Sequence, residues 1–253
     1  MKQLFLLIAL IITISTFAFG QTPDASASAN RIPNGWGKSG DNPTAYDFFA
    51  DKNTKYKGTA SGTIKAKPTA VKDKFGSFIQ VVRADNYRGK RIRLSGYLKT
   101  ENVEEFASFW LRVDGSDLSL LDFDNMEERP TIKGTNDWTK HELIVDVPQN
   151  AGVIVIGTMF GGSTGQVWID ELKLEIVDNN VAKTSMKLTA EAVAEGAKYL
   201  EDLKRNQKEV YEKQIATMKT RPQKPINLDF EDSSQSAPNK SNQKQTTAPT
   251  GKP

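Results

Sequence analysis

A group of aromatic and charged side chains in this sequence could together hold a sugar. Carbohydrate sites on β-sandwiches need flat aromatic rings against the apolar faces of sugar rings, and polar groups beside them that bond the hydroxyls. Alternation of apolar and polar residues places several such side chains on the side away from the core. The candidates are Tyr97, Trp110 and Trp168, with Arg112 and Asp114 alongside, and Trp36 in a loop at a strand end.

The same aromatic rings also have a structural interpretation. They could cover the outside of a second sheet or seal the edges of a sandwich. Trp138, like Trp36, is expected in a loop at a strand end, here the turn Lys133–Trp138. Only the convergence of several rings in one concavity would favour a binding site over this alternative.

The stretch Gly165–Val177 is expected to form the closing strand of the domain. Val167 and Ile169 precede Asp170-Glu171, and Leu172 follows them, so the spacing of the core residues slips by one. Such a slip is what a β-bulge produces. A bulge at this point would leave Trp168 and Asp170 exposed on the non-core face.

Acids gather in one segment and raise the question of a calcium ion, because hard cations bind carboxylates and loop carbonyls. The segment lacks the loop spacing of an EF-hand, and its acids could instead be solvated or paired with Arg112 or Arg129. We therefore expect no cofactor and leave a structural calcium ion as the alternative. The acids are Asp114, Asp117, Asp122, Asp124, Glu127 and Glu128.

Catalytic machinery is hard to build from these residues. The chain has no Cys and one His, which excludes disulfides, thiolate nucleophiles and zinc sites that need several imidazoles. His141 shares a face with Leu143 and Val145, which predicts a histidine at the edge of the core. Neighbouring acids such as Asp170 and Glu171 point to opposite faces of a strand, so they cannot form a glycosidase pair. The sequence predicts a protein that is not an enzyme.

The N-terminal residues resemble a secretion signal. Met1–Gly20 combines one Lys, a long apolar run and small residues near Gln21, which predicts a signal peptide cleaved before Gln21. A membrane anchor is the alternative, but the run is at the short limit of the roughly 20 residues that a span needs. We expect a secreted or periplasmic protein. The net charge of +3, with acids and bases mixed throughout, predicts no nucleic-acid partner.

Three further regions follow the signal. Residues 31–178 contain short alternating segments separated by Gly, Asn, Asp and Pro clusters, which predicts a mainly β, two-sheet antiparallel sandwich. Residues 184–220 are rich in Ala, Glu, Lys and Leu, which predicts one long α-helix. Residues 221–253 are dominated by polar residues and Pro, which predicts a disordered tail. Within that tail, Ile226–Glu231 is too apolar for its surroundings.

Residues 34–177 resemble the galactose-binding-like jelly-roll module of bacterial exported proteins. The resemblance rests on "FIQVVRADNYRGKRIRLSGYLKT", "NDWTKHELIVDVP" and "GGSTGQVWIDELKLEIV". It implies a jelly-roll β-sandwich of the sugar-binding type. Similar modules occur alone, beside transcriptional-regulator annotations, and ahead of C-terminal-processing serine peptidase or erythromycin esterase-like domains.

A short motif of that module is displaced in this chain. Its members often begin with Asn-Leu-Asp-Phe-Glu shortly before a Pro-x-Gly-Trp loop. The loop is present here as Pro33–Trp36, but the matching motif lies at Asn227–Glu231. Either the tail holds the start of a second module, or five residues match by chance.

Taken together, these patterns predict an exported, non-catalytic module that binds carbohydrate or another ligand. The alternative from a different class is a structural or interaction module that binds an envelope protein and no sugar. The resemblance adds a third hypothesis, an accessory fragment of a peptidase or esterase.

The signal prediction is open to direct test. Sequencing the N-terminus of the exported protein should give Gln21 as the first residue, because the small residues before it suit a signal peptidase. A chain that keeps Met1 and sediments with membranes would contradict it.

Overall fold

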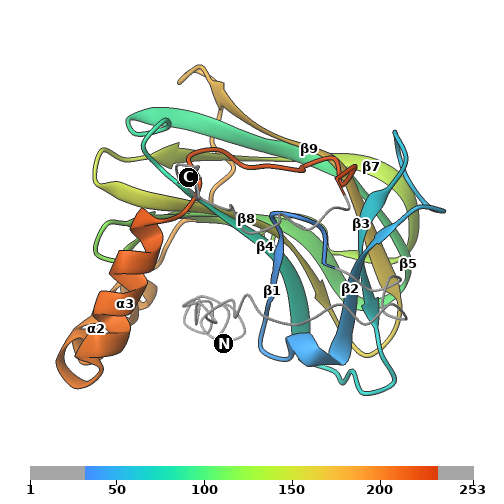
Figure 1. Ribbon diagram of the computed structural model, residues 1–253, viewed down its shortest axis with the longest axis horizontal. Coiled ribbons are helices and arrows are strands. Elements are labelled where there is room, and N and C mark those ends of the chain that lie inside the picture. The colour runs from blue at the N-terminus through green and yellow to red at the C-terminus, as the bar shows by residue number, and fades with distance from the viewer. Residues whose placement is uncertain (1–31, 233–253) are drawn as a thin grey trace, which may run out of the picture.

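The computed structural model describes residues 32–232, which form a mainly antiparallel β structure followed by two helices (Figure 1). The predicted signal peptide and the residues after Asp232 lie outside this range. Within residues 32–232, no helix is both long and apolar enough to cross a membrane. In chain order the strands are β1 (Gly37–Ser39), β2 (Tyr46–Asp51), β3 (Ser61–Ala66), β4 (Phe75–Arg83), β5 (Lys90–Gly115), β6 (Leu120–Asp124), β7 (Ile132–Val147), β8 (Ala151–Gly161) and β9 (Gln166–Val177).

The long strand β5 joins two layers of the structure. Its N-terminal half pairs with β7 and β9, and its C-terminal half pairs with β8 and β6. The first sheet therefore has the order β7-β5-β9-β3-β2, and the second has the order β6-β5-β8-β4-β1. Since one strand runs through both, the two sheets form a single sheet curved nearly into a barrel (Figure 1).

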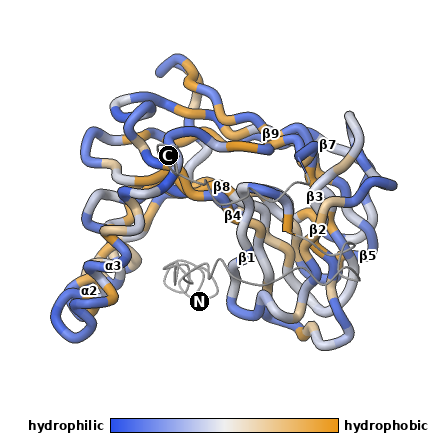
Figure 2. The backbone as a smooth tube through the Cα atoms, in the orientation of Figure 1, coloured by the Kyte–Doolittle hydropathy of each residue, from blue (hydrophilic) through white to orange (hydrophobic). Residues whose placement is uncertain are grey.

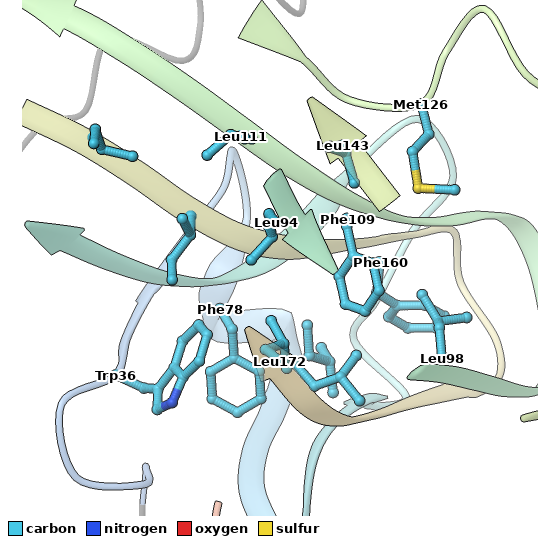
Figure 3. Close-up of a cluster of buried hydrophobic side chains, with 14 of the residues drawn as sticks. Trp36, Phe78, Leu94, Leu98, Phe109, Leu111, Met126, Leu143, Phe160 and Leu172 are labelled. Carbon is cyan, nitrogen blue, oxygen red and sulfur yellow. The ribbon is translucent and has the colours of Figure 1, made fainter. Parts of the chain in front are cut away.

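The main core lies between the two sheets. Alternate residues of β5 point into it, as the sequence predicted: Ile92, Leu94 and Leu98 from the first sheet and Phe109 and Leu111 from the second are fully buried. Figure 3 shows Leu94, Leu98, Phe109 and Leu111 in one cluster with Trp36, Phe78 and Leu172. Figure 2 shows hydrophobic colours on the strands and mainly hydrophilic colours on the turns.

The predicted bulge in β9 is confirmed. Ser95 pairs with Lys173 and Tyr97 pairs with Asp170, so Gly96 faces two residues of β9. Glu171 takes a positive φ of 50°, which the bulge requires. A Cβ at Gly96 would lie 3.0 Å from Cγ of Leu172, so the absence of a side chain there lets the bulged strand pack closely.

The outer face of the second sheet is apolar too, which the sequence analysis did not anticipate. Buried residues of β4, β5, β6 and β8 form a second cluster on this side. Met218 and Ile215 from the C-terminal helix and Met186 from the preceding segment pack on it. The cluster of buried residues is Phe75, Ile79, Val81, Trp110, Phe123, Val153, Val155, Met159 and Met218.

The prediction of one long helix over residues 184–220 is confirmed only in part: the region is mostly helical but not one helix. Two helices form instead, α2 (Ala190–Asn206) and α3 (Lys208–Lys219), and the chain breaks at Gln207 with φ −134°. Residues before α2 are extended along the sheet, where Thr184 N donates to Ile144 O at 2.9 Å and Met186 N donates to Phe123 O at 2.9 Å. Packing of Met218 and Ile215 on the second sheet offsets the loss of helical hydrogen bonds at the break.

The prediction of a disordered tail is wrong for residues 221–232. Residues 226–232, which we call the clasp, lie against the sandwich (red in Figure 1). Phe230 is fully buried in the main core, and its ring stacks on Trp36 with centroids 5.1 Å apart and an interplanar angle of 17°. Burial of this ring supplies the apolar contact that the tail's composition did not suggest.

Hydrogen bonds to the clasp backbone hold it in place. Gln80 accepts from Ile226 N at 2.7 Å and donates to Ile226 O at 3.0 Å. Trp36 Nε1 donates to Asn227 O at 2.9 Å, and Asn227 Nδ2 donates to Asn34 O at 3.0 Å. The displaced Asn-Leu-Asp-Phe-Glu motif therefore lies beside the Pro33–Trp36 loop of its own chain. It completes the sandwich already described, and a second module is not needed to explain it.

Truncation of Phe230 tests the clasp. Phe230→Ala should lower the free energy of unfolding by about 3–5 kcal/mol, because it opens a cavity beside Trp36. Ile226→Ala, in the same segment but with 46% of the side chain exposed, should cost about 1 kcal/mol or less. Urea unfolding curves measure both. Equal and small losses would show that the clasp does not contribute to the core.

Candidate ligand-binding face

The outer face of the first sheet carries the exposed aromatic residues of the domain. Tyr97 and Lys99 of β5 point outward, opposite Asp170 and Trp168 of β9. Lys140 of β7 pairs with Tyr97, which places Trp138, two residues earlier, on the same face. Trp138 is thus part of a strand, and the prediction of a turn over Lys133–Trp138 is wrong.

On this face the ring of Tyr56 contacts two other aromatic rings. The ring of Tyr56, from the loop between β2 and β3, stacks on Tyr97 with centroids 3.6 Å apart and an interplanar angle of 15°. Trp138 meets Tyr56 edge to face at 5.9 Å. Tyr56 is 43% exposed and the other two rings are partly exposed. We call Tyr56, Tyr97 and Trp138 the aromatic trio.

Charged side chains lie next to the trio in sequence and register. Lys99 bonds Asp137 at 2.8 Å, and Lys140 bonds Glu142 at 2.6 Å. The Lys99 ammonium lowers the pKa of Asp137, so this carboxylate stays ionised near neutral pH. The face therefore combines apolar rings with fixed donors and acceptors, the two elements that recognition of a sugar ring requires.

Trp168 and Asp170 are buried beneath this face and hold neighbouring segments in place. The structure corrects the expectation that they are exposed: Trp168 is 4% exposed and Asp170 is fully buried. Asp170 Oδ2 accepts from Tyr56 N at 2.9 Å and from Lys57 N at 3.0 Å, which pins the loop that carries Tyr56. Burial raises the pKa of Asp170, and its backbone N–H donors oppose that shift. Trp168 Nε1 donates to Asp51 Oδ2 at 2.8 Å.

Trp110, Arg112 and Asp114 lie on the outer face of the other sheet, and the expectation that they are exposed is wrong as well. Trp110 is fully buried in the second cluster, where Nε1 donates to Ser77 Oγ at 2.9 Å. Arg112 Nε bonds Asp114 Oδ1 at 2.6 Å, and both residues are 5% exposed. Burial raises the pKa of Asp114, and the charge of Arg112 opposes that shift. These side chains stabilise the sheet under α3 and are closed to a large ligand.

Trp36 is also buried, at 5% exposure, because Phe230 stacks on it. Of the aromatic candidates from the sequence, Tyr97 alone therefore lies in the exposed trio. Tyr56 was missed because it stands in the polar stretch Lys52–Thr59, where no strand pattern assigns it a face. A single large ring in such a stretch is the signal that could have identified it.

Five of the six acids considered for calcium, all but Glu128, have protein partners in the described part of the chain. Asp124 bonds Arg129, and also accepts from Thr184 Oγ1 at 2.5 Å. Asp122 accepts from Lys183 Nζ at 2.7 Å. Among residues 32–232, no cluster of three or more potential metal ligands occurs. His141 is half-buried at the edge of the core, with its ring 6.4 Å from that of Phe109, as the sequence predicted.

Comparison with known proteins gives sequence relatives but no matching family model. The chain is 40% identical over 163 residues to YbfP of Bacillus subtilis strain 168, an uncharacterised HTH-type transcriptional regulator. That match covers 64% of this chain and 54% of the relative. It is 27% identical over 165 residues to the tRNA nuclease WapA of the same strain, covering 60% of this chain and 7% of the relative. The chain thus spans about half of the first relative and a small part of the second.

Solved structures with similar folds include carbohydrate-binding domains. The CBM22-1 xylan-binding domain of Paenibacillus barcinonensis Xyn10C has a TM-score of 0.41 at 13% identity, covering 59% of this chain and 90% of that domain. TmCBM61, solved with β-1,4-galactotriose, has a TM-score of 0.40 at 13% identity, covering 58% and 91%. The enzymatically active domain of bacteriophage CBA120 tailspike protein 4 scores 0.45 at 14% identity, covering 56% and 19%. All these scores lie below 0.5, so the structures establish no shared ligand or binding surface.

Burial of Trp110 yields a prediction about stability. Trp110→Ala should lower the free energy of unfolding by about 3–5 kcal/mol, because it opens a cavity in the second cluster. Trp138→Ala removes the same side chain from an exposed position and should cost about 1 kcal/mol. Urea midpoints of the two variants make the comparison. A larger loss for Trp138→Ala would contradict this assignment of the two sheet faces.

Proposed function

We propose that this chain is an exported, non-catalytic carbohydrate-binding module with a jelly-roll β-sandwich, and that it binds glycan through the aromatic trio. The observation that carries the proposal is the exposure of the trio. Among the described residues, every other pair of contacting aromatic rings includes at least one buried ring. Tyr56 contacts both Tyr97 and Trp138, and none of the three rings is buried.

The chemistry of the trio suits a pyranose ring. Rings presented at the surface can pack on the C–H face of a sugar, which removes apolar area of both from water. The Lys99–Asp137 and Lys140–Glu142 pairs lie beside them and can exchange hydrogen bonds with hydroxyl groups. Because these pairs are already formed, the face loses little side-chain entropy when a ligand binds.

The charge state of the neighbouring acids supports a binding role without catalysis. Hydrolysis of a glycosidic bond uses a general acid whose pKa is raised, so that it holds a proton near neutral pH. Here the partner lysines lower the pKa values of Asp137 and Glu142. Acids in that state accept hydrogen bonds from a sugar but do not protonate a leaving group.

Export agrees with such a role. The Met1–Gly20 signal would place the module outside the cytoplasm, where glycans of envelopes and extracellular polymers are available. The resemblance to jelly-roll modules of exported bacterial proteins, seen in residues 34–177, supports the same assignment. Xylan and β-1,4-galactotriose, the ligands named for the two carbohydrate-binding neighbours, serve as first probes.

A glycan array on the chain without its signal, followed by calorimetry, tests the proposal. Tyr56→Ala and Trp138→Ala should each weaken the affinity for the best glycan about 5- to 150-fold, or about 1–3 kcal/mol, because a stacking surface is lost. Tyr199→Ala on α2 is the matched control and should leave the affinity unchanged. Absence of any bound glycan, or equal losses in all three variants, would overturn the proposal.

A further inference from the structure

The loop that carries Tyr56 is fastened to the sandwich by carboxylates from three parts of the chain. Residues 52–60 form this loop, which we call the Tyr56 loop. Asp51 Oδ1 accepts from Asn53 N at 2.8 Å near its start, and Asp170 holds Tyr56 N and Lys57 N in its middle. Glu231 of the clasp holds its end. Two of these anchors belong to the sheet, and the third arrives from the far end of the described chain.

Contacts between the clasp and the loop are close and specific. Glu231 Oε1 accepts from Thr59 N at 2.7 Å and from Ala60 N at 3.3 Å, and its Oε2 accepts from the Thr59 hydroxyl. These donors lower the pKa of Glu231, and the Thr59 hydroxyl has the largest effect. The carboxylate therefore stays ionised. Gly58 has a φ of +65°, and a Cβ there would lie 2.1 Å from Glu231 Oε1. A glycine is therefore required where the loop turns under the carboxylate.

Phe230 places Glu231 correctly for these contacts. Its ring lies over Gly62 of β3, where a Cβ would be 2.4 Å from Phe230 Cε1. The ring is fully buried against Trp36, so the residue next to it has a fixed position at the edge of the sheet. The clasp thus joins the core, through Phe230, to the Tyr56 loop, through Glu231.

The position of Tyr56 depends on its loop. Its ring is 43% exposed and touches the sheet through the stack on Tyr97, while its backbone N–H is held by Asp170. Without Glu231 the loop would keep its contacts with Asp51 and Asp170 but lose those at Thr59 and Ala60. Its second half would then sample more conformations, and ordering it would reduce the affinity for a ligand.

We propose that the clasp assembles the ligand-binding face, with Glu231 as the positioning residue that fixes the Tyr56 loop. This inference rests on the proposed function, since it names how the same face is organised. It also implies reciprocity: a ligand that orders the Tyr56 loop must stabilise the docked clasp by the same free energy.

The experiment compares two full-length variants in the clasp. Glu231→Ala removes the carboxylate that holds the loop. The control, Asp229→Asn, removes the charge of an exposed carboxylate two residues away but keeps the side-chain oxygen that accepts from Glu231 N. Hydrogen exchange of the amides from Tyr56 to Ala60 is measured without any ligand. It should rise tenfold or more in Glu231→Ala and stay at the wild-type value in Asp229→Asn. Because Phe230 remains in the core, exchange of the β5 and β8 amides should be unchanged in both.

Glycan affinity supplies the second readout. Glu231→Ala should bind the best array glycan about 3- to 10-fold more weakly than the wild type, and Asp229→Asn should bind it as well as the wild type does. Unchanged exchange in the Tyr56 loop overturns the positioning role, whether or not a glycan binds. Faster exchange with unchanged affinity overturns the link between clasp and ligand. A wild type that binds no glycan refutes the proposed function, and the exchange result then still decides whether Glu231 fixes the loop.

Discussion

The stack of Phe230 on Trp36 is the contact on which the closed sandwich depends. The two rings come from opposite ends of the described chain and lie 5.1 Å apart within the main core. Around them the clasp forms hydrogen bonds with the Gln80 side chain and with the backbones of Asn34 and Leu172. A buried aromatic pair contributes through apolar area and ring geometry together, and it holds the polar residues next to it in fixed positions. The positions of Glu231 and of the Tyr56 loop depend on this stack.

The two outer faces of the curved sheet differ in what covers them. One face is covered and supports the fold, and the other is exposed and carries the proposed ligand-binding residues. The second sheet has an apolar outer face, which Met186, Ile215 and Met218 cover. The first sheet has a polar outer face, on which Asp170 and Asp51 hold a loop and the aromatic trio stays exposed. Tryptophans occur on both, so residue type alone could not tell a supporting ring from a ligand-binding one.

Local alternation predicted much of the architecture. It identified the inward residues of β5 and the bulge at Asp170-Glu171, because both follow from a period of two along a single strand. It failed for Trp110, whose burial depends on a helix more than a hundred residues further along the chain. The continuous apolar run Val153–Gly157 in β8, with the pairs Phe78-Ile79 and Val81-Val82 in β4, was the available signal, since strands covered on both faces are apolar along most of their length.

The C-terminal tail and the aromatic trio also show that local sequence patterns do not predict contacts between distant residues. Composition described the average of residues 221–253 correctly as polar, yet residues 226–232 are held by the burial of Phe230 together with hydrogen bonds to Gln80, Trp36 and Asn34. Tyr56 reaches Tyr97 through a loop whose course is set by contacts with Asp51, Asp170 and Glu231. Such contacts join distant parts of the chain, and no pattern of neighbouring residues reveals them.

The most direct test of the central claim is a nuclear magnetic resonance titration of the chain without its signal, using a glycan selected on an array. If the outer face of the first sheet binds sugar, the largest shifts should fall on the ring protons of Tyr56, Tyr97 and Trp138 and on the amides of the Tyr56 loop. Shifts concentrated on α3 and the Ser116-Asp117 turn, where a separate surface hollow lies, would contradict the account.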